Sequence, residues 1–150
     1  MITKSGLRLV AIGATLTGFV VSLLGHVAIL LGVHTPIEPA MNSLLVFGVI
    51  LWLGSGIEAY LLRRELRETG SSAMFRGAPP WMKWLAWAAA AYFALDFWLA
   101  TGHWAGKVTP GDSVASRIAS AAGMMVFAFP FAVFYAAYKR AVSRTVESVQ

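Results

Sequence analysis

The sequence has no cysteine and few charged residues. Asp, Glu, Lys and Arg make up only 13% of its 150 residues, whereas soluble domains carry roughly 25%. The absence of cysteine excludes disulfides, thiolate metal ligands and thiol redox chemistry. Hydrophobic residues make up 58% of the chain, and a soluble protein of this size cannot bury that much apolar surface. The composition therefore indicates a membrane protein.

Four apolar stretches are long enough to cross a bilayer. The hydrocarbon core is about 30 Å thick, so a helix that rises about 1.5 Å per residue needs about 20 residues to span it. We predict spans at approximately 8–33, 40–62, 82–102 and 113–138. Because these stretches do not alternate apolar and polar residues, helices are favoured over barrel strands. The sequence predicts an all-α fold, an integral membrane four-helix transmembrane bundle forming one domain over residues 1–150.

Basic residues lie mainly on one side of the predicted spans. Lys107 and Arg117 fall on one side, and the other ten of the twelve Lys and Arg residues fall at the N-terminus, in the middle connection or at the C-terminus. Short loops rich in Lys and Arg stay in the cytoplasm, so both termini are predicted to be cytoplasmic. This predicts a multi-pass protein of a plasma membrane of the bacterial inner-membrane type. The net charge of +5 is explained by topology, and no nucleic-acid partner is predicted.

Small residues line one face of each predicted helix, which suits close helix packing in lipid. They are Ala14, Gly18 and Ser22 leading to His26, then Gly48, Ser55 and Gly56, then Ala86, Ala90 and Ala94, and finally Ser116, Ala119, Ser120 and Gly123. The two halves of the chain also share a short pattern, because Gly-His-Val-Ala at 25–28 matches Gly-His-Trp-Ala at 102–105. A tandem two-helix repeat would relate the halves by a pseudo-two-fold axis along the membrane normal.

Ionisable residues gather in the outer half of the predicted bundle. Such a group inside a span costs about 2.5–3.5 kcal/mol on insertion scales, so it indicates a partner or a function. From the helical rise, Asp96 lies about 6 Å outside the midplane. Asp96 and His103 are seven residues apart and are predicted to share a helix face. The candidate residues for binding a proton or substrate are Asp96, His26, His103, Arg117 and, in the cytoplasmic half, Glu58.

Several roles remain open for these residues. Asp96 could pair with Arg117 or His26 and hold helices together, or it could titrate in a proton or substrate site with the histidines as a relay. A metal site would use His26, His103 and a carboxylate, with His34 as a further candidate ligand. A b-type haem would use His26 and His103 as axial ligands. Glu58 is explained by a salt bridge, by snorkelling to the interface or by a role as cytoplasmic gate partner of Asp96.

Catalysis finds little support in the sequence. It contains neither a Gly-rich phosphate loop nor a Gly-x-Ser-x-Gly elbow, and the predicted loops are too short to build an aqueous active site. The sequence favours a small transporter or channel-type protein, embedded in lipid as a homo-oligomer, with its polar site around Asp96, His26 and His103. The alternative is a non-catalytic accessory or anchor subunit of a larger membrane complex, with haem b bound through His26 and His103 as a special case.

Overall fold

The computed structural model describes residues 4–33, 38–66, 71–103 and 114–147. These residues are almost entirely helical, and no strand occurs among them, so the all-α prediction is confirmed. The elements are α1 (Lys4–Leu30), α2 (Glu38–Leu66), the short α3 (Ser71–Met74), α4 (Pro80–Trp98), the π-helical segment η1 (Leu99–His103) and α5 (Val114–Glu147).

Within the part of the chain that the structure describes, three helices are long and apolar enough to cross a membrane. They are α1, the part of α2 over Ser43–Leu66, and the part of α5 over Ser116–Arg144. The 19-residue helix α4 is not among them, because Lys83, Asp96 and its tryptophans lower its hydropathy. Large apolar side chains are exposed along α1 and α2, among them Leu24 at 63% and Ile50 at 60%. A continuous apolar surface of this kind suits lipid and not water, which supports the prediction of a membrane-embedded protein.

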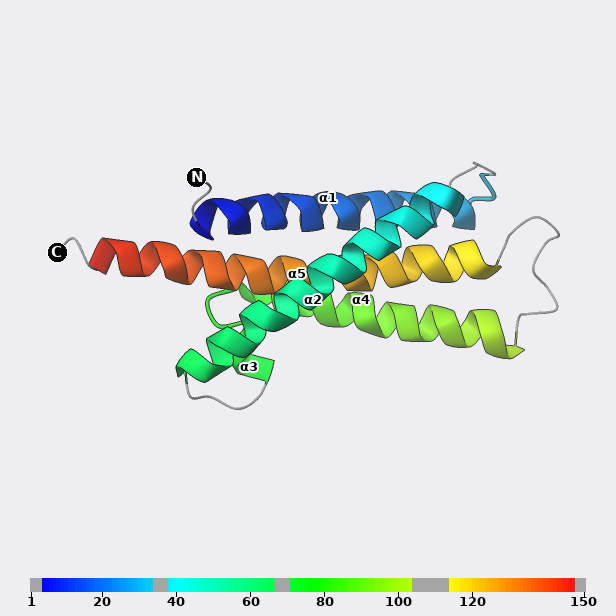
Figure 1. Ribbon diagram of the computed structural model, residues 1–150. Coiled ribbons are helices and arrows are strands. Elements are labelled where there is room, and N and C mark those ends of the chain that lie inside the picture. The colour runs from blue at the N-terminus through cyan, green and yellow to red at the C-terminus, as the bar shows by residue number, and fades with distance from the viewer. Residues whose placement is uncertain (1–3, 34–37, 67–70, 104–113, 148–150) are drawn as a thin grey trace.

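The central helix of the bundle is α5. Figure 1 shows α1 and α4 running alongside α5, and α2 crossing it obliquely. In the most apolar stretch of α5, 67% of the residues are buried, compared with 17% in the corresponding stretches of α1 and α2. Its sequence permits this position because it has small residues along much of its length and no charged residue between 118 and 138. The other three long helices therefore pack mainly on α5 and much less on one another.

Two glycines let α1 and α2 approach α5 closely around Phe127. The Phe127 ring is fully buried. A Cβ atom added at Gly18 of α1 would overlap the ring, and one added at Gly48 of α2 would lie 2.9 Å from its Cζ atom. A similar contact lies further along the α1–α5 interface, where a Cβ at Gly123 would lie 2.5 Å from Ser22 Oγ. These contacts are the close, small-residue packing that joins helices in lipid.

The helix ends that carry most of the basic residues meet at one end of the bundle, hereafter the basic end. Figure 1 places the N-terminus, the C-terminus and α3 at this end. The start of α1 brings Lys4 and Arg8, the last turn of α2 brings Arg63 and Arg64, and the last turn of α5 brings Arg144. The opposite end is formed by the end of α1, the start of α2, the end of α4 and the start of α5.

The packing does not show the two-fold relationship that a tandem repeat predicts. If α1 and α2 were equivalent to α4 and α5, then α4 would pack on α2 as α1 packs on α5. In the described part of the chain α1 packs on α5 extensively, whereas α2 and α4 scarcely touch. The oblique path of α2 across α5 accounts for this asymmetry (Figure 1).

The third predicted span, 82–102, departs from a regular α-helix near the end that lies away from the basic end. The prediction continued the helix to residue 102, but α4 ends at Trp98 and the chain continues as η1. The Thr101 hydroxyl donates to the Phe97 carbonyl at 2.7 Å, and such a bond competes with the regular backbone pattern. A π segment changes the angle between successive residues, and the predicted shared face of Asp96 and His103 depends on a side chain that the structure does not describe. The His103 side chain, His34 and residues 104–113 lie outside the described residues.

Candidate functional site

Side chains from three helices form a polar cluster in the half of the bundle away from the basic end. This cluster consists of Asp96 and Tyr92 from α4, Arg117 and Ser120 from α5, and His26 from α1. Each residue lies near the end of its helix at this side: His26 is close to Leu30, where α1 ends, and Arg117 is close to Val114, where α5 begins. The fold thus brings together three of the residues that the sequence predicted for a site, namely Asp96, Arg117 and His26.

An ion pair between Asp96 and Arg117 joins α4 to α5. Arg117 Nε donates to Asp96 Oδ1 at 2.8 Å, and Arg117 Nη2 donates to the same oxygen. The Asp96 side chain is 2% exposed, whereas that of Arg117 is 33% exposed. A buried carboxylate needs such a partner, because isolation from water is costly for an unpaired charge. The guanidinium therefore connects the buried carboxylate to the surface of the bundle.

The second carboxylate oxygen of Asp96 is left without a partner. Both guanidinium nitrogens contact Oδ1, and Oδ2 is buried with no hydrogen-bond partner. Leaving a buried acceptor unsatisfied costs about 1–3 kcal/mol, and more for a charged group. Buried polar atoms are rarely unsatisfied in native proteins, so each one calls for an explanation. Here the free oxygen lies inside the bundle and provides an acceptor for a proton or a hydrogen-bond donor.

His26 is the centre of a hydrogen-bonded chain that crosses the three helices. Its Nδ1 atom lies 2.8 Å from Ser120 Oγ, and its Nε2 atom lies 2.7 Å from the Tyr92 hydroxyl. Ser120 donates its hydroxyl hydrogen to the Arg117 carbonyl at 2.8 Å. Since a serine hydroxyl has one hydrogen, Ser120 must accept from Nδ1–H, and Nε2 then accepts from Tyr92. The bonds run in one direction, from Tyr92 through His26 and Ser120 to the Arg117 carbonyl.

The arrangement around His26 does not fit a metal or haem ligand. Both ring nitrogens are engaged by Ser120 and Tyr92, so binding a metal ion through either one would break an interhelical hydrogen bond. Among the described residues there is no group of three or more His, Asp or Glu side chains that could hold a metal ion. The other two proposed ligands, His103 and His34, have side chains outside the described residues. The hydrogen bonds of His26 therefore argue against a role for its ring as a haem or metal ligand.

Sequence reasoning missed two members of the cluster, Tyr92 and Ser120. Helical spacing could have found both. Tyr92 precedes Asp96 by four residues and Ser120 follows Arg117 by three, and side chains at these separations are neighbours on a helix. The sequence places Ser120 only on a predicted packing face, and it suggests no role for Tyr92.

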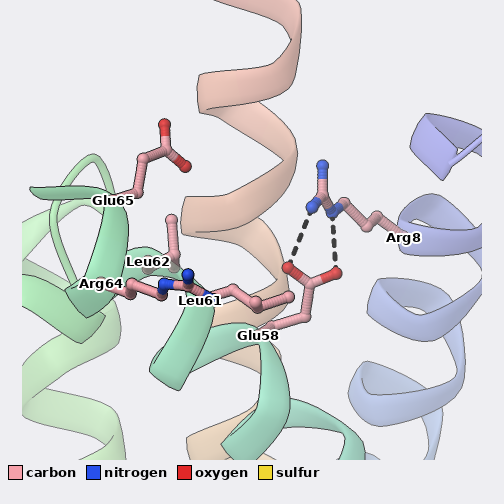
Figure 2. A pocket seen from close by; sticks show the side chains of 6 residues that line it. All are labelled: Arg8, Glu58, Leu61, Leu62, Arg64 and Glu65. Atoms are coloured by element: carbon pink, nitrogen blue, oxygen red, sulfur yellow. Dashed lines mark hydrogen bonds and ion pairs between the residues drawn. The ribbon is translucent and has the colours of Figure 1, made fainter.

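Glu58 lies apart from the cluster, towards the basic end. Arg8 of α1 donates from Nε to Glu58 Oε1 at 3.1 Å and from Nη2 to Oε2 at 2.9 Å. Each side chain is 22% exposed. Figure 2 shows this pair at one side of a crevice of about 450 Å³, which Leu61, Leu62, Arg64 and Glu65 also line. A two-point contact of this kind fixes both side chains, so Glu58 serves to join α1 and α2.

No protein-family model matches the chain, and no curated protein or solved structure is significantly similar to it. The function is therefore argued from the geometry of the polar cluster.

Proposed function

We propose that the protein is a small transporter or channel-type membrane protein that moves protons, with the polar cluster as its proton-binding site. One observation carries this proposal: Asp96 Oδ2 is buried and has no hydrogen-bond partner. Ionisable residues inside membrane spans are rare and costly, and they mark substrate, ion and proton pathways. Asp96 is the group that takes up the proton, and it does so at Oδ2, since Oδ1 is held by Arg117.

Proton uptake at Asp96 changes the interaction that joins α4 to α5. A neutral carboxyl no longer attracts the Arg117 guanidinium as a carboxylate does, so the ion pair weakens. The Arg117 side chain is one-third exposed and has room to move outward when released. His26 lies beside this pair, with ring nitrogens bonded to two hydroxyl groups that can donate or accept. Histidine in such a chain is suited to relay protons.

The proposal includes a topology. The basic end faces the cytoplasm, following the preference of Lys- and Arg-rich segments for that side, and both termini are then cytoplasmic. The membrane is a plasma membrane of the bacterial inner-membrane type. The shorter α4 crosses it as a fourth span because it runs alongside α5 (Figure 1). Since α5 fills the centre of the bundle, the proton pathway lies at its side, next to α4 and Arg117. A second copy of the chain completes this pathway in a homo-oligomer.

Proton flux into liposomes tests the proposed function. The purified protein is reconstituted with an internal pH dye, and a potassium gradient with valinomycin drives proton entry. We expect the wild-type protein to acidify the lumen faster than protein-free liposomes, and Asp96→Asn to abolish this gain. Glu65→Gln is the matched control, because it neutralises an acidic residue that pairs with Arg144 at the basic end. Equal flux for wild type and Asp96→Asn would overturn the proposal, as would wild-type flux no faster than that of protein-free liposomes.

A second candidate is a non-catalytic accessory or anchor subunit of a larger membrane complex. It is favoured by the full hydrogen bonding of His26, because a histidine with both nitrogens engaged holds three helices together without further chemistry. In that case the cluster stabilises the bundle and Asp96→Asn affects stability alone. Purification from native membranes in mild detergent, followed by mass measurement, distinguishes the two. One larger partner in fixed stoichiometry supports the subunit, whereas an assembly of this chain alone supports the transporter.

A further inference from the structure

A groove on the outside of α2 has features of a lipid site. It lies near the basic end, where α2, α3 and α5 meet, and has a volume of about 250 Å³. Its walls are mainly apolar and aromatic, with Trp52 and Tyr60 on α2, Met74 on α3 and Phe129 on α5, and Arg63 is the only charged residue among the described residues that line it. We propose that this groove, hereafter the α2 groove, binds one anionic phospholipid. The proposal depends on the membrane placement of the chain but not on proton transport.

The length of the α2 groove matches one leaflet of a bilayer. Trp52 and Arg63 are eleven residues apart on one helix, which corresponds to about 16 Å at the helical rise. Half of the hydrocarbon core is about 15 Å. Trp52, Tyr60 and Arg63 recur at helical spacing and so lie along one side of α2. An acyl chain lying in the groove would therefore end near Trp52 when its head group is level with Arg63.

The charge at the end of the α2 groove selects an anionic head group. Arg63 Nε is buried and has no hydrogen-bond partner in the described part of the chain, and none of the described lining residues is acidic. A buried guanidinium nitrogen without a partner is unfavourable, and a phosphate oxygen is a partner whose geometry suits it. Anionic lipids are enriched in the cytoplasmic leaflet, which the basic end attracts. Arg63 therefore lies at the end of the bundle where the membrane supplies an anionic ligand.

Gly56 keeps the floor of the α2 groove open. It lies between Trp52 and Arg63 on α2, and a Cβ added there would meet no atom within 4 Å. The wall opposite is held in place, because the Phe129 ring packs edge-on against Phe75 with 5.2 Å between ring centroids. A larger side chain at position 56 can therefore fill the groove without disturbing the helices around it. This property supplies a variant that blocks the site and leaves the fold intact.

Native mass spectrometry of the full chain in detergent tests the proposal. The protein is titrated with phosphatidylglycerol, with phosphatidylcholine of the same acyl chains, and with inorganic phosphate alone. We expect one phosphatidylglycerol to be retained about tenfold more tightly than phosphatidylcholine, as loss of a charge-assisted hydrogen bond implies. Arg63→Ala should remove this preference. Arg64→Ala is the matched control, because it removes the same charge from the neighbouring position, which lines the separate crevice beside Glu58.

A second pair of variants tests the acyl-chain part of the α2 groove. Gly56→Leu should weaken binding of both phospholipids about tenfold or more. Gly13→Leu adds the same side chain to an open position on α1, where a Cβ also meets nothing within 4 Å, and should leave binding unchanged. Equal effects of Arg63→Ala and Arg64→Ala, or of Gly56→Leu and Gly13→Leu, would overturn the proposal. Competition by inorganic phosphate as strong as that by phosphatidylglycerol would also overturn it, since it would indicate an anion site without a lipid chain.

Discussion

Arg117 donates two hydrogen bonds to one carboxylate oxygen of Asp96, and this leaves the other oxygen buried without a partner. A symmetric fork, in which each nitrogen contacts its own oxygen, would have satisfied the carboxylate completely. The chain forms such a fork elsewhere, between Arg8 and Glu58. In the Arg8–Glu58 pair both carboxylate oxygens accept a hydrogen bond, whereas in the Asp96–Arg117 pair one carboxylate oxygen stays free. This difference between the two pairs bears on function.

Removing Arg117 alone should destabilise the bundle more than removing both charges. Arg117→Met leaves the Asp96 carboxylate buried without its partner, and we expect a loss of about 3 kcal/mol in the free energy of unfolding. Adding Asp96→Asn to that variant removes the stranded charge and should restore more than half of the loss. Reversible unfolding by mixing detergents with SDS at neutral pH measures both. A double variant as unstable as Arg117→Met would show that the ion pair does not govern this site.

The His26 ring should carry its proton on Nδ1. This tautomer follows from the single hydrogen of Ser120, which is donated to the Arg117 carbonyl and obliges Ser120 to accept from the ring. Nitrogen chemical shifts of selectively labelled histidine distinguish the two tautomers. Tyr92→Phe should perturb the shift of Nε2 most, and Ser120→Ala that of Nδ1. A dominant Nε2–H form would contradict the direction of the chain. Each of these substitutions should also lower stability by about 0.6 kcal/mol, the average for interhelical bonds in membrane proteins.

Gly18 should tolerate no side chain. Gly18→Ala places a Cβ into the buried Phe127 ring, and overpacking of a tight core costs about 1–3 kcal/mol. Gly13→Ala is the control on the same helix, because its added Cβ meets nothing; it should be neutral or slightly stabilising, since alanine favours the helix. Thermal unfolding in detergent compares them. Equal stability of the two variants would contradict the close contact between α1 and α5.

Ser22 should be replaceable by alanine without loss of stability. Its hydroxyl is buried and has no hydrogen-bond partner, so Ser22→Ala removes an unsatisfied group and should be neutral or stabilising by up to about 1 kcal/mol. Gly123→Ala should destabilise, because its Cβ would lie 2.5 Å from Ser22 Oγ. Combining Ser22→Gly with Gly123→Ala removes the Ser22 side chain that the added Cβ would meet, so this double variant should recover stability. The same unfolding assay reads out all three, and a destabilising Ser22→Ala would indicate a partner for the hydroxyl.

The sequence allowed the helices to be predicted because their apolar runs are long and carry few charges. The sequence also allowed Asp96 to be predicted as a candidate site residue, because a carboxylate inside an apolar run is unusual in any fold. Which helix would be central was harder to predict. In lipid both the packing face and the outer face of a helix are apolar, so the pattern that separates inside from outside in soluble proteins is weak. Ala94 and Gly56 illustrate this, because both belonged to predicted packing faces and both are exposed.

Two features of the cluster depend on tertiary structure and could not be read from spacing. The bond between His26 and Tyr92 joins residues 66 positions apart, and it requires α1 and α4 to approach each other across α5. The π segment after Trp98 is equally invisible in the pattern, because the apolar run continues without a break through Leu99 and Ala100. By contrast, the buried glycines of the α1–α5 and α2–α5 interfaces, Gly18 and Gly48, were on the predicted packing faces and are buried there.

The central claim is that Asp96 takes up a proton inside the bundle, and infrared difference spectroscopy tests it most directly. Spectra of the reconstituted protein are recorded at neutral and acidic pH, for wild type, Asp96→Asn and the control Glu65→Gln. The account predicts a protonated carboxyl band on acidification that is present in wild type and Glu65→Gln and absent in Asp96→Asn. The same band in all three proteins would contradict the account, because the proton would then bind elsewhere.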